Sequence, residues 1–139
     1  MTNGNVGLLE GLDVQLHSFR DERGLLTFAQ EYDGLPFQLK RMFWITDVPV
    51  GSVRGGHAHK KCKQFICCLH GSFRLTLKTM HEKKVFEMNN PDYGIYIPEG
   101  VWCSLEDFTE GTVVLVGASE KYNREGYIRD WNEYVQVYG

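Results

Sequence analysis

Residues 51–71, which read GSVRGGHAHKKCKQFICCLHG, determine how the rest of this chain is interpreted. Two histidines, His57 and His59, stand one residue apart in this stretch. In a β-strand, side chains at positions i and i+2 lie on the same face of the sheet. We therefore predict that the two imidazoles project together and that Ala58, between them, points to the opposite face.

The spacing within residues 51–71 also matches a known motif. The spacing of Gly51, His57, His59, Gln64 and Gly71 resembles that of the first signature motif of the cupins. Cupins are small double-stranded β-helix barrels. The second cupin motif resembles residues 98–103, which read PEGVWC. The resemblance implies an all-β, single-domain cupin, a jelly-roll barrel, over residues 13–139.

Two positions depart from the metal-binding cupin pattern. Gln64 stands where the family usually has a glutamate, and Cys103 stands where it has a third histidine. A neutral amide oxygen is a poor ligand for a divalent transition metal. We therefore expect no metal or other cofactor. Instead, the two imidazoles, whose ordinary pKa is about 6.5, would transfer protons at neutral pH.

The pattern along the chain also predicts a barrel. Short alternating stretches separated by turn residues recur, which favours an antiparallel barrel or jelly roll. Residues 1–12 are rich in Gly and Asn, so we expect a flexible arm there. At the other end, Trp131, Tyr134 and Tyr138 have helical spacing, which predicts a short C-terminal helix capped by Asp130 and packed on the barrel. The expected strands cover residues 14–19, 25–30, 38–48, 63–70, 73–78, 84–88, 94–97, 101–105 and 112–118.

Composition restricts the compartment and the partners. A chain of 139 residues forms one domain with a sizeable core. Its formal charge of -3 argues against a nucleic-acid partner. No apolar run approaches the roughly 18 residues of a membrane span, and the N-terminus does not resemble a secretion signal. Four cysteines without a CxxC pair are typical of reduced, mostly buried thiols, so we expect a cytoplasmic protein.

Two arginines lie on predicted strands. Arg41 shares a strand face with apolar neighbours, and a buried guanidinium needs a partner because an unpaired charge is costly there. A ligand phosphate and an internal carboxylate are equal alternatives for that partner. Arg74 is either an exposed strand charge or a second contact to an anion.

Further phrases resemble the nucleotide-sugar 3,4-ketoisomerases, which act on thymidine diphosphate 4-keto-6-deoxyglucose. They are residues 21–24, 40–41, 54–61, 64, 74, 98–102 and 127–129. The resemblance implies isomerisation of the 4-keto sugar to its 3-keto form by a metal-independent homodimer. It places the reaction in the biosynthesis of an unusual deoxy or deoxyamino sugar, as found in lipopolysaccharide or S-layer glycans.

The resemblance also assigns roles to residues. It makes His57 and His59 the proton-transfer pair, acting through an enediol. We expect His59 to move the proton between the two carbons and His57 the proton between the two oxygens, with the opposite assignment still open. The candidate substrate-binding residues are Arg23, Arg41, Arg54, Gln64, Arg74 and Cys103. Cys103 replaces a histidine of the family, so the C4 stereochemistry of the product stays open.

Other functions remain alternatives. A nucleotide-sugar epimerase of the related barrel type would pair a histidine base with a tyrosine acid, for which Tyr93 and Tyr96 are candidates. A metal-dependent cupin oxygenase would contain a metal. A sugar-binding cupin would bind the nucleotide sugar without turnover. Product analysis, metal content and ligand binding distinguish these alternatives.

Overall fold

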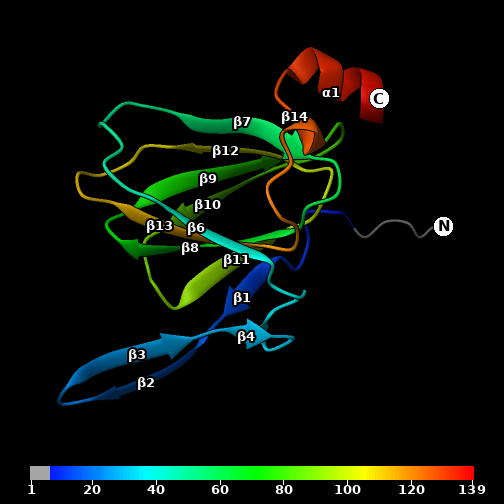
Figure 1. Cartoon of the computed structure of the whole chain (residues 1–139). Helices are drawn as coiled ribbons and strands as arrows, with labels where there is room; N and C mark the ends of the chain where they lie inside the picture. The colour runs from blue at the N-terminus through cyan, green and yellow to red at the C-terminus, as the bar shows by residue number, and fades with distance from the viewer. Residues whose placement is uncertain (1–6) are drawn as a thin grey trace.

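Two five-stranded antiparallel sheets face each other and form a barrel (Figure 1). The computed structural model describes residues 7–139. The first sheet has the order β1 (Asp13–Gln15), β11 (Tyr93–Ile97), β8 (Gln64–His70), β13 (Val113–Ala118) and β6 (Arg41–Ile45). The second has the order β10 (Lys83–Met88), β9 (Phe73–Lys78), β12 (Trp102–Glu106), β7 (Arg54–His59) and β14 (Tyr127–Ile128). The predicted all-β cupin barrel is confirmed.

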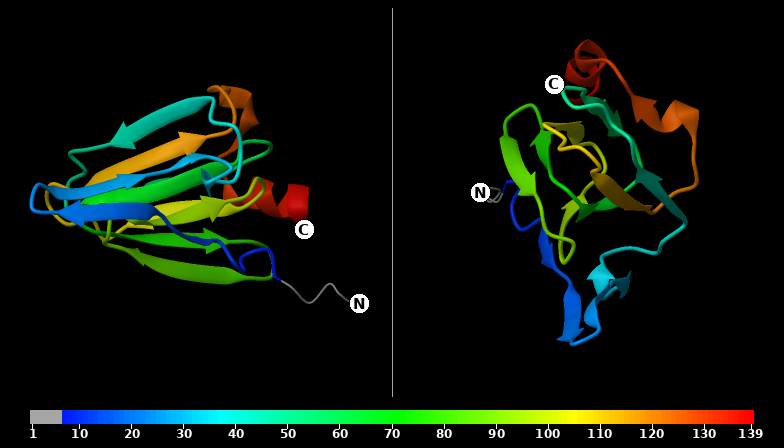
Figure 2. Two further views of the ribbon diagram at one scale, coloured as in Figure 1. Left: turned by 90° about the horizontal axis from the view of Figure 1, so that it is seen from below. Right: turned by 90° about the vertical axis from the view of Figure 1, so that its left-hand side faces the viewer.

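A hairpin extends from one side of this barrel. Its strands are β2 (His17–Asp21) and β3 (Gly24–Phe28), and it projects beyond the two sheets in Figure 1 and in the right-hand view of Figure 2. The hairpin was predicted, whereas the short parallel pair β4 (Gln30–Glu31) and β5 (Gly34–Leu35) that follows it was not. The pair has only two residues per strand, too few for an alternating pattern to be recognised.

The interior between the sheets is apolar, and strand alternation decides which side chains enter it. Cys67 and Cys68 are adjacent in β8 and both buried, yet they belong to different clusters. Cys68 lies in the main core, while Cys67 packs with Phe65 and Phe37 on the other face of the sheet. The opposite orientation expected for the two cysteines is confirmed, and all four cysteines are free and buried.

The N-terminal segment requires a correction. Residues 1–6 of the expected flexible arm lie outside the described residues. From residue 7 onward the expectation is wrong, because Leu9 and Leu12 retain only 1% and 4% of their accessible surface and belong to the main core. Burying two leucines stabilises the packed position of this segment by about 1.5 to 3 kcal/mol each. The segment therefore closes one part of the barrel.

The predicted C-terminal helix is present as α1 (Trp131–Tyr138). Tyr134 is almost fully buried, and its hydroxyl donates a hydrogen bond to the carbonyl oxygen of Gly100 at 2.5 Å. Asp130 occupies the N-cap position, but its side chain makes no capping hydrogen bond. The helix thus holds the turn before β12 through its aromatic face. Within residues 7–139, no helix is long and apolar enough to cross a membrane.

Candidate active site

The two histidines lie at the end of β7 and share one face, as predicted. Their ring centroids are 5.0 Å apart, and the ring planes are nearly perpendicular, at 88°. His59 is buried and His57 half-buried. Ala58 points the other way, into a buried cluster with Trp102, Ile128 and Tyr134 beneath helix α1. Because side chains alternate along the strand, the face of β7 opposite the two imidazoles packs against this buried cluster.

Strand pairing encloses the histidines from both sides. On β12, Cys103 is the register partner of His57, and on β14, Tyr127 is the partner of His59. The Tyr127 ring lies 4.3 Å from the His59 ring and 5.1 Å from the His57 ring, centroid to centroid. Tyr127 was not among the predicted site residues. The signal that pointed to it was the matching phrase at residues 127–129.

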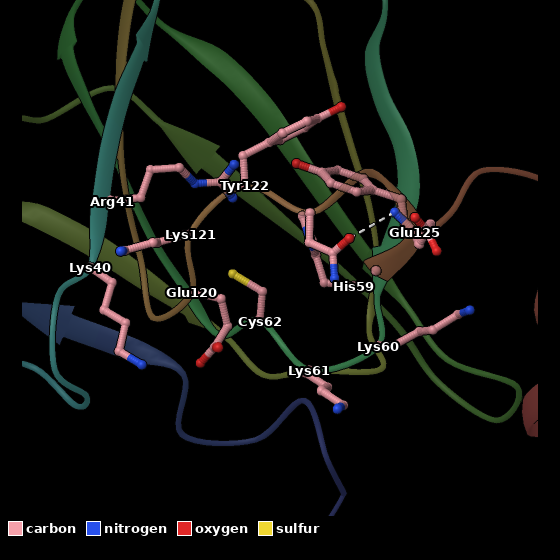
Figure 3. A pocket seen from close by; sticks show the side chains of 13 residues that line it. Lys40, Arg41, His59, Lys60, Lys61, Cys62, Glu120, Lys121, Tyr122 and Glu125 are labelled. Atoms are coloured by element: carbon pink, nitrogen blue, oxygen red, sulfur yellow. Dashed lines mark hydrogen bonds between the residues drawn. The ribbon is translucent and has the colours of Figure 1, made fainter.

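Two cavities meet at the histidine pair. The inner cavity, of about 290 Å³, contains His57 and three of the predicted substrate-binding residues, Arg54, Gln64 and Cys103. The outer cavity, of about 740 Å³, contains His59 and Arg41 (Figure 3). Tyr127 lines both. Because each histidine faces one cavity, a ligand that spans the two would contact both imidazoles.

Positive charge gathers around the outer cavity. Besides Arg41, the lining contains four lysines but only two carboxylates; they are Lys40, Lys60, Lys61, Lys121, Glu120 and Glu125 (Figure 3). The protein as a whole is acidic, with a formal charge of -3. A local excess of cations on an acidic protein favours an anionic ligand at this position.

The structure tests one of the two partners considered for Arg41, the internal carboxylate. Its guanidinium carbon lies 5.3 Å from the centroid of the Phe43 ring and 5.7 Å from that of the Tyr122 ring. Its Nε is buried and has no hydrogen-bond partner among residues 7–139. No carboxylate in this part of the chain forms an ion pair with it. The internal carboxylate is therefore excluded for the described residues.

Both imidazoles are held in the neutral form. Burial, together with the positive charges nearby, lowers the pKa of His59 to about 3. Burial and the guanidinium groups of Arg129 and Arg54 lower the pKa of His57 as well. Nε2 of His59 is buried without a hydrogen-bond partner within residues 7–139. A neutral imidazole with an unpartnered nitrogen has a lone pair that can accept a proton, although a pKa of about 3 makes His59 a weaker base than a free histidine.

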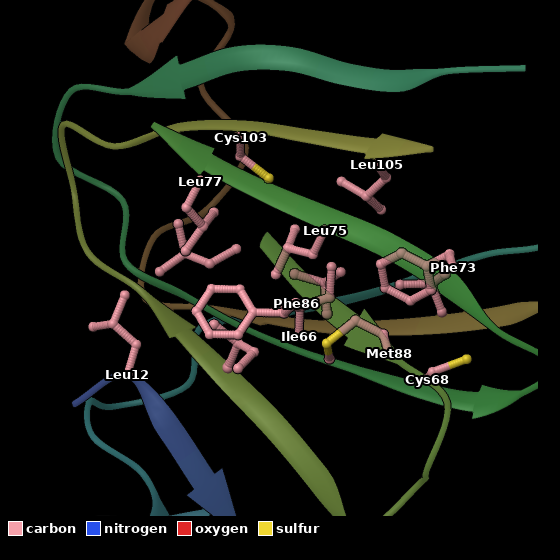
Figure 4. Close-up of a cluster of buried hydrophobic side chains, with 14 of the residues drawn as sticks. Leu12, Ile66, Cys68, Phe73, Leu75, Leu77, Phe86, Met88, Cys103 and Leu105 are labelled. Atoms are coloured by element: carbon pink, nitrogen blue, oxygen red, sulfur yellow. The ribbon is translucent and has the colours of Figure 1, made fainter. Parts of the chain in front are cut away.

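Cys103 and Gln64 form part of the wall between this site and the core. Cys103 is buried among leucines (Figure 4), and burial raises the pKa of its thiol to about 12. The thiol is therefore protonated at neutral pH and is neither a nucleophile nor a metal ligand in that state. Gln64 is buried at the start of β8. Within residues 7–139, no group of three or more His, Cys, Asp or Glu side chains is placed to hold a metal ion.

Two of the predicted substrate-binding arginines lie outside both cavities. Nε of Arg74 donates to Glu87 at 2.8 Å, and another of its nitrogens donates to Asp107 at 2.5 Å. Arg74 therefore corresponds to the exposed-charge alternative. Arg23 is exposed near the tip of the β2–β3 hairpin, where it pairs with Asp21. Sequence alone did not show that these arginines point away from the histidines.

The tyrosines considered for an epimerase do not reach the site either. The hydroxyl of Tyr93 donates to the Asp13 carboxylate at 2.6 Å, and burial together with this bond raises the tyrosine pKa to about 12. Tyr96 packs against Phe37. Neither tyrosine lines a cavity that contains a histidine of the pair. The epimerase alternative thus loses both of its candidate acids.

Fold and site together define a cupin-type enzyme with a histidine pair. The family model described as "FdtA: WxcM-like, C-terminal" matches residues 13–139. The chain belongs to this family, that of the cupin-type nucleotide-sugar 3,4-ketoisomerases, and is an isomerase.

Known relatives carry the same activity in their names. The chain is 32% identical over 126 residues to TDP-4-oxo-6-deoxy-alpha-D-glucose-3,4-oxoisomerase of Aneurinibacillus thermoaerophilus, covering 91% of each chain. Among solved structures it is similar to a mutant of the 3,4-ketoisomerase QdtA from Thermoanaerobacterium thermosaccharolyticum in complex with TDP-4-keto-6-deoxyglucose, with a TM-score of 0.88, 39% identity and 91% of each chain covered. It is also similar to the TDP-quinovose 3,4-ketoisomerase WlaRB of Campylobacter jejuni, with a TM-score of 0.85, 32% identity, and 89% of this chain and 95% of that chain covered.

Proposed function

We propose that the protein converts thymidine diphosphate 4-keto-6-deoxyglucose into its 3-keto isomer, with His57 and His59 transferring the protons. The observation that carries this proposal is the pair of neutral imidazoles, 5.0 Å apart, at the junction of a small inner cavity and a cationic outer cavity. The names of the relatives support the substrate.

The proposed reaction needs only proton transfers. A base removes the proton from C3, and the electron pair moves so that the C4 carbonyl oxygen accepts a proton and an enediol forms. The C3 hydroxyl then loses its proton, and C4 receives one. C3 is oxidised to a ketone while C4 is reduced to an alcohol, so the electrons balance within the sugar and no external oxidant is required. We assign the carbon proton to His59, whose Nε2 has no partner among residues 7–139, and the oxygen proton to His57.

The two cavities suggest how the substrate is oriented. The inner cavity lies at the lower end of the volumes typical of ligand pockets and suits a single sugar ring beside Arg54, Gln64 and Cys103. The reacting carbons of that ring would lie at the junction of the two cavities, between His57 and His59. The diphosphate would then lie in the outer cavity. Guanidinium groups bind phosphate through parallel hydrogen bonds, and Arg41 is placed there with an unpartnered Nε.

A homodimer is the second part of the proposal. Large apolar side chains are exposed on the hairpin and on the edge strand β6; they include Phe19, Leu26, Met42 and Trp44. Exposed apolar patches and open strand edges are typical of association surfaces. Arg23, at the hairpin tip, would contact a substrate only across such a dimer. Sedimentation or light scattering should give twice the chain mass, and a monomer would contradict this part.

The remaining parts of the proposal concern cofactor, compartment and pathway. We propose that turnover needs no metal, because Gln64 and Cys103 occupy two of the usual ligand positions. Four free, buried thiols fit a cytoplasmic location. A 3-keto sugar has the carbonyl that an amino group could replace, which fits the biosynthesis of a deoxyamino sugar.

The decisive experiment is incubation of the purified protein with the 4-keto nucleotide sugar, followed by NMR of the product. We expect the 3-keto isomer, and the configuration at C4 is read from the same spectrum. Exhaustive chelation should leave the rate unchanged, whereas loss of turnover restored by one divalent ion would refute the metal-free part. Binding without product would favour the non-catalytic alternative.

A further inference from the structure

Arg129 is an exposed residue directly after a buried one, beside the histidines. It follows β14, whose Ile128 is fully buried against Ala58 and Trp102. The guanidinium carbon of Arg129 lies 4.3 Å from the centroid of the Tyr127 ring. The register of β14 with β7 places that ring opposite His59. Arg129, Tyr127 and the histidine pair therefore form one connected cluster.

The charge of Arg129 acts on the whole site. Arg129 lines the inner cavity together with His57 and Arg54, and no carboxylate among residues 7–139 forms an ion pair with it. Its positive charge lowers the pKa of both histidines, whereas Arg41 acts on His59 and Arg54 on His57. Arg129 is thus the cation that the two histidines share.

We propose that Arg129, held on the Tyr127 ring, stabilises the negative charge that develops on the sugar oxygen in the inner cavity, and that Tyr127 is its positioning residue. This inference rests on the proposed isomerisation. When the C3 proton leaves, negative charge develops on the C4 oxygen, and a preorganised donor in a cavity stabilises that charge most effectively. A guanidinium does not deprotonate, so it donates hydrogen bonds without competing with the imidazoles for the transferred protons.

The surroundings of the pair favour Arg129 over other groups in this role. Arg54, on β7, also lines the inner cavity, but we have already assigned it to binding the sugar ring. The Cys103 thiol on β12 is protonated and carries no charge. Arg41, on β6, lines the outer cavity, where we place the diphosphate. The carboxylates that line the two cavities, Glu120 and Glu125, are both in the outer one. Arg129 is therefore a cation of the inner cavity with no other assigned task.

The test replaces the charge and follows two readouts. Arg129→Gln should lower kcat by about 10²- to 10³-fold, as the loss of a transition-state donor does, while KM changes by less than about threefold. Arg129→Lys should recover part of kcat. Without substrate, NMR titration of the ring signals should show a raised pKa for both His57 and His59 in Arg129→Gln. The control Arg124→Gln changes an exposed arginine nearby that lines neither cavity, and it should match the wild type.

A second pair of variants tests the positioning role. Tyr127→Phe keeps the ring under Arg129 and should retain most of kcat, whereas Tyr127→Leu should lose as much as Arg129→Gln. Combining Tyr127→Leu with Arg129→Gln should add little further loss, because the two residues act as a unit. Circular dichroism checks that each variant folds.

The outcomes separate this inference from the proposed function. Failure of the wild type to form the 3-keto sugar would refute the proposed function. Normal wild-type turnover together with an unchanged kcat in Arg129→Gln would overturn only the role of Arg129. A change confined to KM, or unchanged histidine pKa values, would also overturn it.

Discussion

The inner and outer cavities are built from different kinds of structure. The inner cavity is walled by strands, with His57, Gln64 and Cys103 projecting from β7, β8 and β12. The outer cavity is lined largely by the segments that follow β7 and β13, where lysines and glutamates are exposed. Paired strands hold side chains in place, while loops tolerate long, solvated charges. The difference suggests that the strand residues at the junction of the two cavities carry out the chemistry, while the loops of the outer cavity bind the charged part of the ligand.

Removing either histidine should have the largest effect. His57→Asn and His59→Asn should each lower kcat by roughly 10²- to 10⁴-fold, because one general acid or base is lost. In D₂O, His59→Asn should abolish deuterium incorporation at C3 as well as product formation, whereas His57→Asn should keep slow incorporation. The reverse pattern would exchange the two roles. Full turnover in both variants would remove the pair from the mechanism.

A substitution in the outer cavity should change KM more than kcat. Arg41→Ala should raise KM about 10- to 100-fold and lower kcat much less, because a phosphate contact is made equally in the ground state and the transition state. Steady-state kinetics and titration with TDP measure both effects. An unchanged KM in a folded variant, or a loss confined to kcat, would contradict the division between the two cavities.

Acidity should weaken the folded state through His59. The folded pKa of His59 is about 3, below its ordinary value of 6.5, so the unfolded chain binds more protons between these two pH values. The free energy of unfolding should therefore fall as pH falls through this window, by up to about 1.4 kcal/mol per pH unit for this group. Urea denaturation at pH 7 and pH 5 measures the slope. His59→Asn should reduce it, and an unchanged slope would show that the imidazole does not titrate in this way.

Substituting Cys103 should have a smaller effect on activity. Cys103→Ser and Cys103→His should both keep substantial activity, within about tenfold, because the buried thiol is protonated and takes no part in the proton transfers. The C4 configuration of the product should be compared by NMR in both variants. Complete inactivation of a well-folded variant would show that the thiol itself takes part.

Substituting Arg74, which lies outside both cavities, should have the smallest effect on activity and KM. Arg74→Gln removes exposed ion pairs with Glu87 and Asp107, which usually contribute less than about 1 kcal/mol. Activity and KM should match the wild type within about twofold. A large increase in KM would place Arg74 among the substrate contacts after all.

Local periodicity in the sequence was enough to predict several features of the fold and the site. His57 and His59 share a face because a strand alternates every residue, and the same rule separates Cys67 from Cys68. The helical spacing of Trp131 and Tyr134 likewise predicted α1. These relations join residues close in the chain, so they do not depend on the rest of the fold.

Contacts between segments far apart in the chain became visible only in the folded protein. Tyr127 and Arg129 reach the histidines because β14 pairs with the edge of β7, a pairing that no local pattern specifies. Arg74 turned out to face carboxylates of β10 and of the chain beyond β12 rather than the site. A strand pattern predicts which side chains share a face, but the choice of neighbouring strand depends on burial and hydrogen bonding across the whole barrel. For that reason the histidine pair was found from the sequence, while the cation beside it was found only in the folded chain.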